Sequence, residues 1–140
     1  MMGGMLDAAG AEHELVTLGL GRPFAYRGSL AQGLTLRYRE REREVSAGFL
    51  RALWRRYAGR NVLAGLHGSA PPANGLGWWV RSASRRLNTQ PLSISDASRL
   101  AAILVAEGWA EVQRRDRALY LMFAGEPDSP LEEPLPEENR

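Results

Sequence analysis

The fold is decided by residues 92–123, which read LSISDASRLAAILVAEGWAEVQRRDRALYLMF. Ser93 at its start is a good helix cap, and Asp96 falls in the first turn, where its charge suits the helix dipole. Gly108 is the residue type that ends a helix in the left-handed conformation. Residues 110–113 and 118–123 then alternate as a hairpin does, and its tip holds Arg114, Arg115 and Arg117. The stretch therefore predicts a capped helix followed by a basic hairpin.

Working outward, the upstream chain predicts further elements. Residues 14–20 and 33–39 have strand patterns, with turns expected near Gly21-Arg22-Pro23 and Arg27-Gly28-Ser29 between them. Residues 46–58 have the clearest helical spacing, carried by Phe49, Leu50, Leu53, Trp54 and Tyr57, with a cap at Ser46 and a stop at Gly59. A short strand at 61–66, a loop at 67–77 and a helix at 78–87 complete the order. An antiparallel β element and an amphipathic helix thus precede the decisive stretch.

The second strand continues into a run of alternating charge. If the extended conformation persists, one face carries Arg37, Arg39, Arg41 and Arg43, and the other carries Glu40, Glu42 and Glu44. Two interpretations stay open. The arginine face is either a surface that follows phosphates or a solvated, ion-paired strand end.

Composition limits the chemistry. The chain has no cysteine and no lysine, since all eighteen basic residues are arginine. Disulfides, thiol catalysis, Schiff bases and the P-loop lysine are therefore excluded. Neither His13 nor His67 lies in a metal-ligand spacing, and Ser69 lacks a nucleophile-elbow context. We expect no enzymatic activity, no cofactor and no metal.

The formal charge of +2 conceals a strong asymmetry. Residues 125–140 hold six acids and one arginine, whereas residues 1–124 hold seventeen arginines and ten acids, a balance of +7. A body this basic suits a polyanionic partner. The longest uncharged apolar run, residues 100–106, is too short to cross a bilayer, and residues 1–10 do not resemble a signal peptide, so we expect a cytoplasmic protein.

The same composition sets the domain boundaries. The Gly-rich residues 1–11 are expected to be disordered, and residues 12–124 are expected to form a single α+β domain. Residues 125–140 are too rich in proline and acid to build a core, so a disordered acidic tail is predicted.

Residues 78–124 resemble the winged helix-turn-helix of MarR-type transcription regulators. The likeness rests on a short helix at 80–87, a serine-led helix start at 95–100, a glycine exit at 107–111 and a basic hairpin. It implies a double-stranded DNA-binding protein that regulates transcription, as a homodimer. Position by position, it implies DNA-facing residues at Ser93, Ser95, Ser98 and Arg99, and wing residues at Arg114, Arg115 and Arg117. Phosphate contacts are also expected from the supporting helix, at Arg81, Arg85 and Arg86.

Two alternatives follow from the residues. The predicted third helix is apolar almost all round through residues 100–106, so either the N-terminal strands or a second copy of the chain must cover its other face. If that cover lies over Ser95 and Arg99, direct base contact fails, and a protein-interaction module becomes the alternative function. The second alternative is binding of single-stranded nucleic acid or RNA through Trp78, Trp79 and the arginine-rich strand. No small-molecule effector is evident from the sequence.

Overall fold

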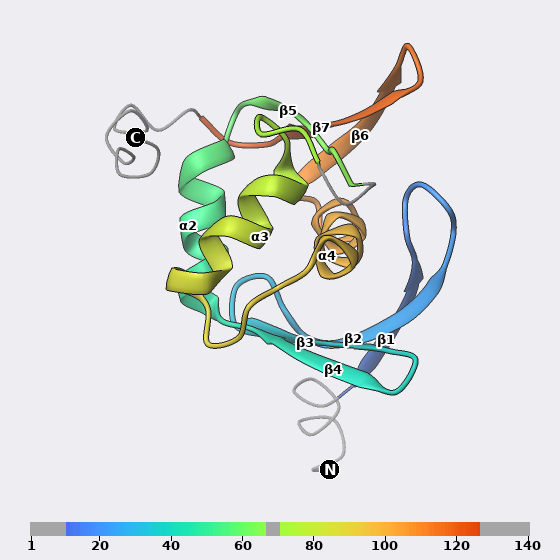
Figure 1. The fold of residues 1–140 in the computed structure, drawn as a ribbon, viewed down its shortest axis with the longest axis vertical. Helices are drawn as coiled ribbons and strands as arrows, with labels where there is room; N and C mark the ends of the chain where they lie inside the picture. The colour runs from blue at the N-terminus through green and yellow to red at the C-terminus, as the bar shows by residue number, and fades with distance from the viewer. Residues whose placement is uncertain (1–10, 67–70, 127–140) are drawn as a thin grey trace.

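The computed structural model of the protein describes residues 11–66 and 71–126. In this part of the chain, three helices and seven strands make an α+β fold with two antiparallel sheets (Figure 1). The first sheet is a meander of β1 (Glu12–Val16), β2 (Pro23–Ser29), β3 (Gly33–Tyr38) and β4 (Arg41–Val45). The helices are α2 (Ala47–Tyr57), α3 (Leu76–Leu87) and α4 (Ile94–Ala106). The second sheet has the order β5-β7-β6, from β5 (Asn61–Leu63), β6 (Ala110–Arg115) and β7 (Ala118–Phe123). The predicted α+β class is confirmed.

Helix α4 lies at the centre of the molecule, with the four-stranded sheet on one side and α2 and α3 on another (Figure 1). Its buried residues are Asp96, Ala97, Arg99, Leu100, Ala101, Ala102, Ile103 and Leu104. The inner face of the meander supplies Phe24, Tyr26, Leu36 and Tyr38 to the same core. The N-terminal strands are therefore the cover that the apolar helix requires.

The ends of α4 form as the sequence predicts. The Ser93 hydroxyl accepts a hydrogen bond from the Asp96 amide at 3.1 Å, and the Ser93 amide donates to the Asp96 carboxylate at 2.9 Å. At the other end Gly108 has a φ of 82°, and the Trp109 amide donates to the Leu104 carbonyl at 2.9 Å. Both arrangements satisfy backbone groups that a helix end leaves without partners.

Helix α2 also follows its predicted pattern, with one difference. The Ser46 cap accepts from the Phe49 amide, and Gly59 takes a left-handed conformation at φ 75°. The predicted apolar face is buried except for Trp54, which is half-buried and packs edge-on against Trp109 at 4.8 Å between ring centroids. Helix α3 begins two residues before its predicted start, at Leu76, and β5 is shorter than the expected 61–66 strand.

The N-terminal region contains a strand that the sequence patterns did not predict. The turn expected at residues 27–29 is wrong, because these residues belong to β2 and pair with β3. Gly28 has a φ of 92°, and a Cβ on it would collide with the carbonyl of Gly33. Gly28 therefore permits the close approach of two strands and does not mark a turn.

The predicted strand face of four arginines does not form. The chain turns at Arg39 and Glu40, where Arg39 has a φ of 57°, and Tyr38 pairs with Arg41. Arg37 and Arg43 consequently point to opposite faces of the sheet, because partner positions share a face and neighbours alternate. Arg37 lies on the outer face, where it forms a two-point ion pair with Glu12 at 2.6 and 2.7 Å.

Several sequence predictions lie outside the described residues. These are the conformation of residues 1–10, most of the acidic tail at 127–140, and the part of the 67–77 loop that includes His67 and Ser69. The described chain extends to Glu126, and Gly125 packs against the Trp54 ring.

A pair of helical glycines tests the close approach of α3 to the chain that follows β5. Gly77 and Gly48 are both the second residue of a helix. A Cβ on Gly77 would collide with the Gly65 carbonyl, whereas a Cβ on Gly48 would only touch the Arg51 guanidinium at 3.9 Å, an ordinary van der Waals contact. We expect Gly77→Ala to destabilise the protein by about 1–3 kcal/mol, the usual cost of overpacking. Gly48→Ala should stabilise it by about 0.5–1 kcal/mol, because alanine loses less backbone entropy. Urea unfolding of both variants measures the difference, and equal effects would contradict the close approach.

Candidate nucleic-acid interface

Arg99 is not exposed, contrary to the expectation that it faces DNA. Its relative accessibility is 7%, and its guanidinium lies 3.8 Å from the centroid of the Tyr38 ring. One terminal nitrogen donates to the Ser95 carbonyl at 3.0 Å. The N-terminal sheet thus lies over the position from which Arg99 was expected to reach a base, so direct base contact by this side chain fails in the structure.

Two tyrosine–carboxylate hydrogen bonds join the sheet to the two ends of α4. The Tyr38 hydroxyl donates to Asp96 at 2.7 Å, and the Tyr26 hydroxyl donates to Glu107 at 2.7 Å. Glu107 also accepts from the Leu30 amide at 2.9 Å. Burial, together with the bonded carboxylates, raises the pKa of both tyrosines, so both hydroxyls stay protonated and donate.

The three serines at the start of α4 differ in exposure. Ser93 and Ser95 are exposed, and Ser98 is half-buried. The hydroxyl of Ser93 is occupied as the helix cap. Ser95 is therefore the serine of this group with the most freedom to contact a ligand.

The wing arginines all lie on the exposed β6–β7 hairpin (Figure 1). Arg117 sits at the tip with a φ of 68°, and Arg115 stacks on Tyr120 at 4.9 Å from the ring centroid. Arg114 donates to the carbonyl of Leu18, in the β1–β2 loop, at 3.0 Å. The hairpin is thus in contact with the N-terminal sheet rather than projecting alone.

The supporting helix exposes two of its three arginines. Arg85 and Arg86 are exposed in the last turn of α3, and Arg81 is half-buried. The side chain of Asn88, which follows them, donates to the Glu44 carbonyl at 2.7 Å and accepts from the Ser46 amide at 2.7 Å. These bonds fix the end of α3 beside the start of α2 and the end of β4.

The sequence contains a further signal of a basic surface. From Val45 to Ser95 the chain contains seven arginines and no aspartate or glutamate. These arginines are Arg51, Arg55, Arg56, Arg60, Arg81, Arg85 and Arg86. Counting acids in a sliding window, rather than over the whole body, would have found this segment.

The acids of the N-terminal half gather instead on the outer face of the meander. There Glu12 pairs with Arg37 and lies 3.6 Å from Arg27, and Arg27 lies 3.8 Å from Glu42. The hydrogen bonds from Arg37 lower the pKa of Glu12. This face is an ion-paired surface, so the interpretation of the charged run as a solvated, ion-paired strand end holds for Arg37.

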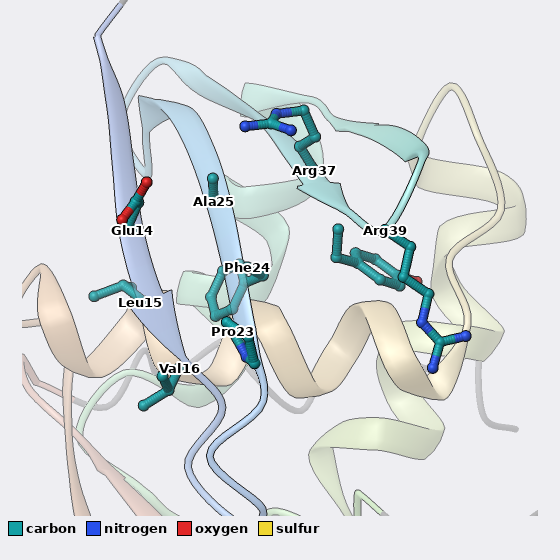
Figure 2. A pocket seen from close by; sticks show the side chains of 9 residues that line it. Glu14, Leu15, Val16, Pro23, Phe24, Ala25, Arg37 and Arg39 are labelled. Atoms are coloured by element: carbon teal, nitrogen blue, oxygen red, sulfur yellow. The ribbon is translucent and has the colours of Figure 1, made fainter.

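Figure 2 shows the hollow over the ends of β1, β2 and β3, lined by Glu14, Arg37 and Arg39 around apolar residues such as Pro23 and Ala25. Its lining includes no histidine, serine or threonine.

Across the described residues, no group of three histidine, aspartate or glutamate side chains is placed to hold a metal. In the same part of the chain, no helix is long and apolar enough to cross a membrane.

Neither tryptophan forms an open platform for bases. Trp79 stacks on Phe49 at 5.3 Å and meets the edge of Tyr57 at 5.8 Å between centroids, so it belongs to the packing of α2 on α3. Trp78 is half-buried beside it. With Arg37 paired and the arginine run broken by a turn, the features behind the single-strand hypothesis do not come together.

Comparisons of the chain with protein-family models, with curated proteins and with solved structures found no match.

The contact between Tyr38 and Asp96 has a measurable consequence. Asp96 is 1% accessible, so Tyr38→Phe leaves one of its oxygens buried without its donor. We expect a loss of about 1–3 kcal/mol of unfolding free energy in a urea titration. Tyr120→Phe in the wing is the matched control and should change stability by less than about 0.5 kcal/mol. Similar losses in the two variants would show that the buried hydrogen bond does not hold the sheet.

Chemical modification tests whether the sheet stays over α4. Phenylglyoxal reacts with accessible guanidinium groups, and mass spectrometry of peptides reports the extent at each arginine. We expect Arg85, Arg86 and Arg117, which are exposed, to react first, and Arg99 to be protected until the protein unfolds. Reaction of Arg99 at the rate of Arg85 in the folded protein would contradict the covered position.

Proposed function

We propose that residues 47–123 form a winged helix that binds double-stranded DNA. Helix, strand, two helices and a hairpin follow one another in the order of that fold, and the strand order β5-β7-β6 places the first strand beside the second strand of the hairpin. In this interpretation α4 occupies the place of the recognition helix and β6–β7 the place of the wing. The four-stranded meander is an addition before the first helix.

The acid-free segment carries the proposal. Seven arginines with no acid between Val45 and Ser95 produce a local positive field, and Glu12 and Glu42 of the N-terminal sheet are paired with arginines of that sheet. Phosphate contacts supply most of the sequence-independent affinity of a DNA-binding protein. A surface with this composition suits a dense polyanion better than a mixed-charge protein surface.

The proposed interface surrounds the N-terminal end of α4. The Leu92 amide donates to the Ser84 hydroxyl at 2.8 Å, which brings the last turn of α3, with Arg85 and Arg86, near the start of α4. Ser95 lies in the first turn of α4, and the wing contacts the β1–β2 loop through Arg114. Because Arg99 is covered, the contacts are to backbone phosphates and carry little base discrimination. The proposal is therefore phosphate-mediated duplex binding. Sequence-specific regulation of transcription would need further base contacts.

The alternative of a protein-interaction module has lost its main argument. It required the apolar face of α4 to be open to a partner or to a second copy, and that face is occupied by Phe24, Tyr26 and Leu36 of the same chain. The same fact removes the reason for expecting a homodimer through α4. Dimerisation through another surface stays a prediction.

Fluorescence anisotropy with a labelled duplex at about 50–200 mM salt tests the proposal. Arg85→Ala with Arg86→Ala should weaken binding to every sequence and flatten the dependence of log K on log salt by roughly two units, because two fewer counterions are released. Arg114→Ala and Arg115→Ala with Arg117→Asn should flatten it by roughly two to three units. Asparagine is used at Arg117 because it tolerates the positive φ.

The matched control is Arg27→Ala with Arg37→Ala. It removes the same charge from the outer face of the sheet, where both arginines are paired with acids, and should leave the salt slope unchanged. A wild-type protein that shows no duplex binding at about 50 mM salt would refute the proposal. A loss only in Arg51→Ala with Arg55→Ala would move the interface to α2.

A further inference from the structure

Two exposed arginines lie at the same end of the N-terminal sheet, at the edge formed by the start of β2 and the end of β3. Arg22 comes directly before β2 and Arg39 directly after β3, and the pairing of Ala25 with Arg37 brings these strand ends together. The Arg22 backbone is fixed by its bonds with Thr17, at 2.9 Å to the hydroxyl and 3.0 Å from the Thr17 amide to the Arg22 carbonyl. Figure 2 shows the Arg39 side chain extending from the end of β3 toward α4, which crosses behind the strands.

Arg99 lies beneath this edge with a donor unused. Its Nε is buried and has no hydrogen-bond partner in the described structure, although the side chain is more than nine-tenths buried. Burial lowers the pKa of Arg99 most; Tyr38 and Asp96 raise it, and the nearby positive charges of Arg39 and Arg22 lower it again. The charges of Arg39 and Arg22 thus both act on the buried guanidinium of Arg99.

Within the described chain, Arg22 and Arg39 form no direct ion pair, and Glu14 is the acid that lines the same hollow as Arg39. No hydrogen bond or ion pair of the Arg22 or Arg39 side chains occurs among residues 11–66 and 71–126. The acid that acts on Arg99 is Asp96, whose oxygens are already bonded to Tyr38 and Ser93. Three like charges held together in this way are stabilised by an anion from outside.

We propose that Arg22 and Arg39, above the buried guanidinium of Arg99, form a phosphate-binding site at this end of the N-terminal sheet. The ligand is a backbone phosphate of duplex DNA, so this inference rests on the proposed function. The forked donors of guanidinium groups match phosphate oxygens, and the exposed Ser95, whose carbonyl binds Arg99, lies at the same place. The meander therefore replaces base contacts by α4 with a phosphate contact beside it.

The choice of phosphate over a carboxylate of an acidic protein rests on charge. The edge adjoins the start of α4, and the acid-free segment ends at that point in the chain, at Ser95. A chain of phosphates can contact both the arginines at the sheet end and those of the acid-free segment. A single carboxylate can contact only the arginines at the sheet end. Acidic peptide binding is thus an outcome that the experiment must separate.

The test uses the full chain with isotope-labelled arginine side chains. Inorganic phosphate and then a short duplex are titrated while the Arg99 Nε–H resonance is followed by NMR. Arg22→Ala with Arg39→Asn removes the outer arginines, asparagine being chosen for the positive φ at Arg39. The control is again Arg27→Ala with Arg37→Ala, which removes equal charge from the ion-paired outer face.

We expect saturable phosphate shifts at Arg99 in the wild type and the control, and none in the Arg22/Arg39 variant. With duplex DNA, that variant should flatten the salt slope by roughly two units. If the Arg99 shifts persist in the variant, or do not occur in the wild type, the proposed site is wrong. Duplex binding that persists in that case still supports the proposed function. Phosphate shifts without any duplex binding by the wild type overturn the assignment to DNA. Equal shifts with poly-glutamate overturn the preference for phosphate.

Discussion

Helix α4 has to be covered on nearly all sides, and the rest of the architecture depends on that constraint. Its run from Leu100 to Leu104 is fully apolar and buried, so no single layer can remove it from water. Helix α3 and β6 pack on one side, and the inner face of the meander packs on the other. A surface helix that reads a DNA groove needs one polar face, which this sequence does not provide beyond its first turns. The apolar composition of α4 therefore requires that other elements cover it.

Polar groups then determine how the sheet lies on the helix. Apolar contact alone is non-directional, whereas a buried carboxylate without a partner is costly, so the bonds from Tyr38 to Asp96 and from Tyr26 to Glu107 fix both ends of α4 against the sheet. Asp96 serves twice, because the same carboxylate also closes the capping box with Ser93. Local helix initiation and the long-range docking of residues 58 positions apart are therefore coupled through one side chain.

The parts of the fold that could be predicted from the sequence are those that local interactions determine. The caps at Ser46 and Ser93, the stop at Gly108 and the β6–β7 hairpin depend on a few neighbouring residues, and each forms as expected. Strand β2 was missed because Gly28 serves a close approach between strands, which depends on the partner strand. The turn at Arg39 was missed because a left-handed arginine gives no local signal. The burial of Arg99 depends on the meander folding back over α4, a contact that no local pattern contains.

The distribution of charge explains how a chain of nearly neutral total charge presents a basic surface. On the outer face of the meander, acids and arginines alternate across strands and neutralise one another, as Glu12 does with Arg37 and Arg27. The helical segment from Val45 to Ser95 has no acid available for such pairing, so its exposed arginines keep their full charge. Solvent screens exposed charges beyond roughly 10 Å at 0.1 M salt, so the local balance matters more to a ligand than the total. A polyanion approaching the start of α4 therefore meets unpaired guanidinium groups from both the helices and the sheet edge. If the ligand is duplex DNA, as proposed, such an arrangement favours backbone contact over base recognition, because the fold buries the helix that would otherwise enter a groove.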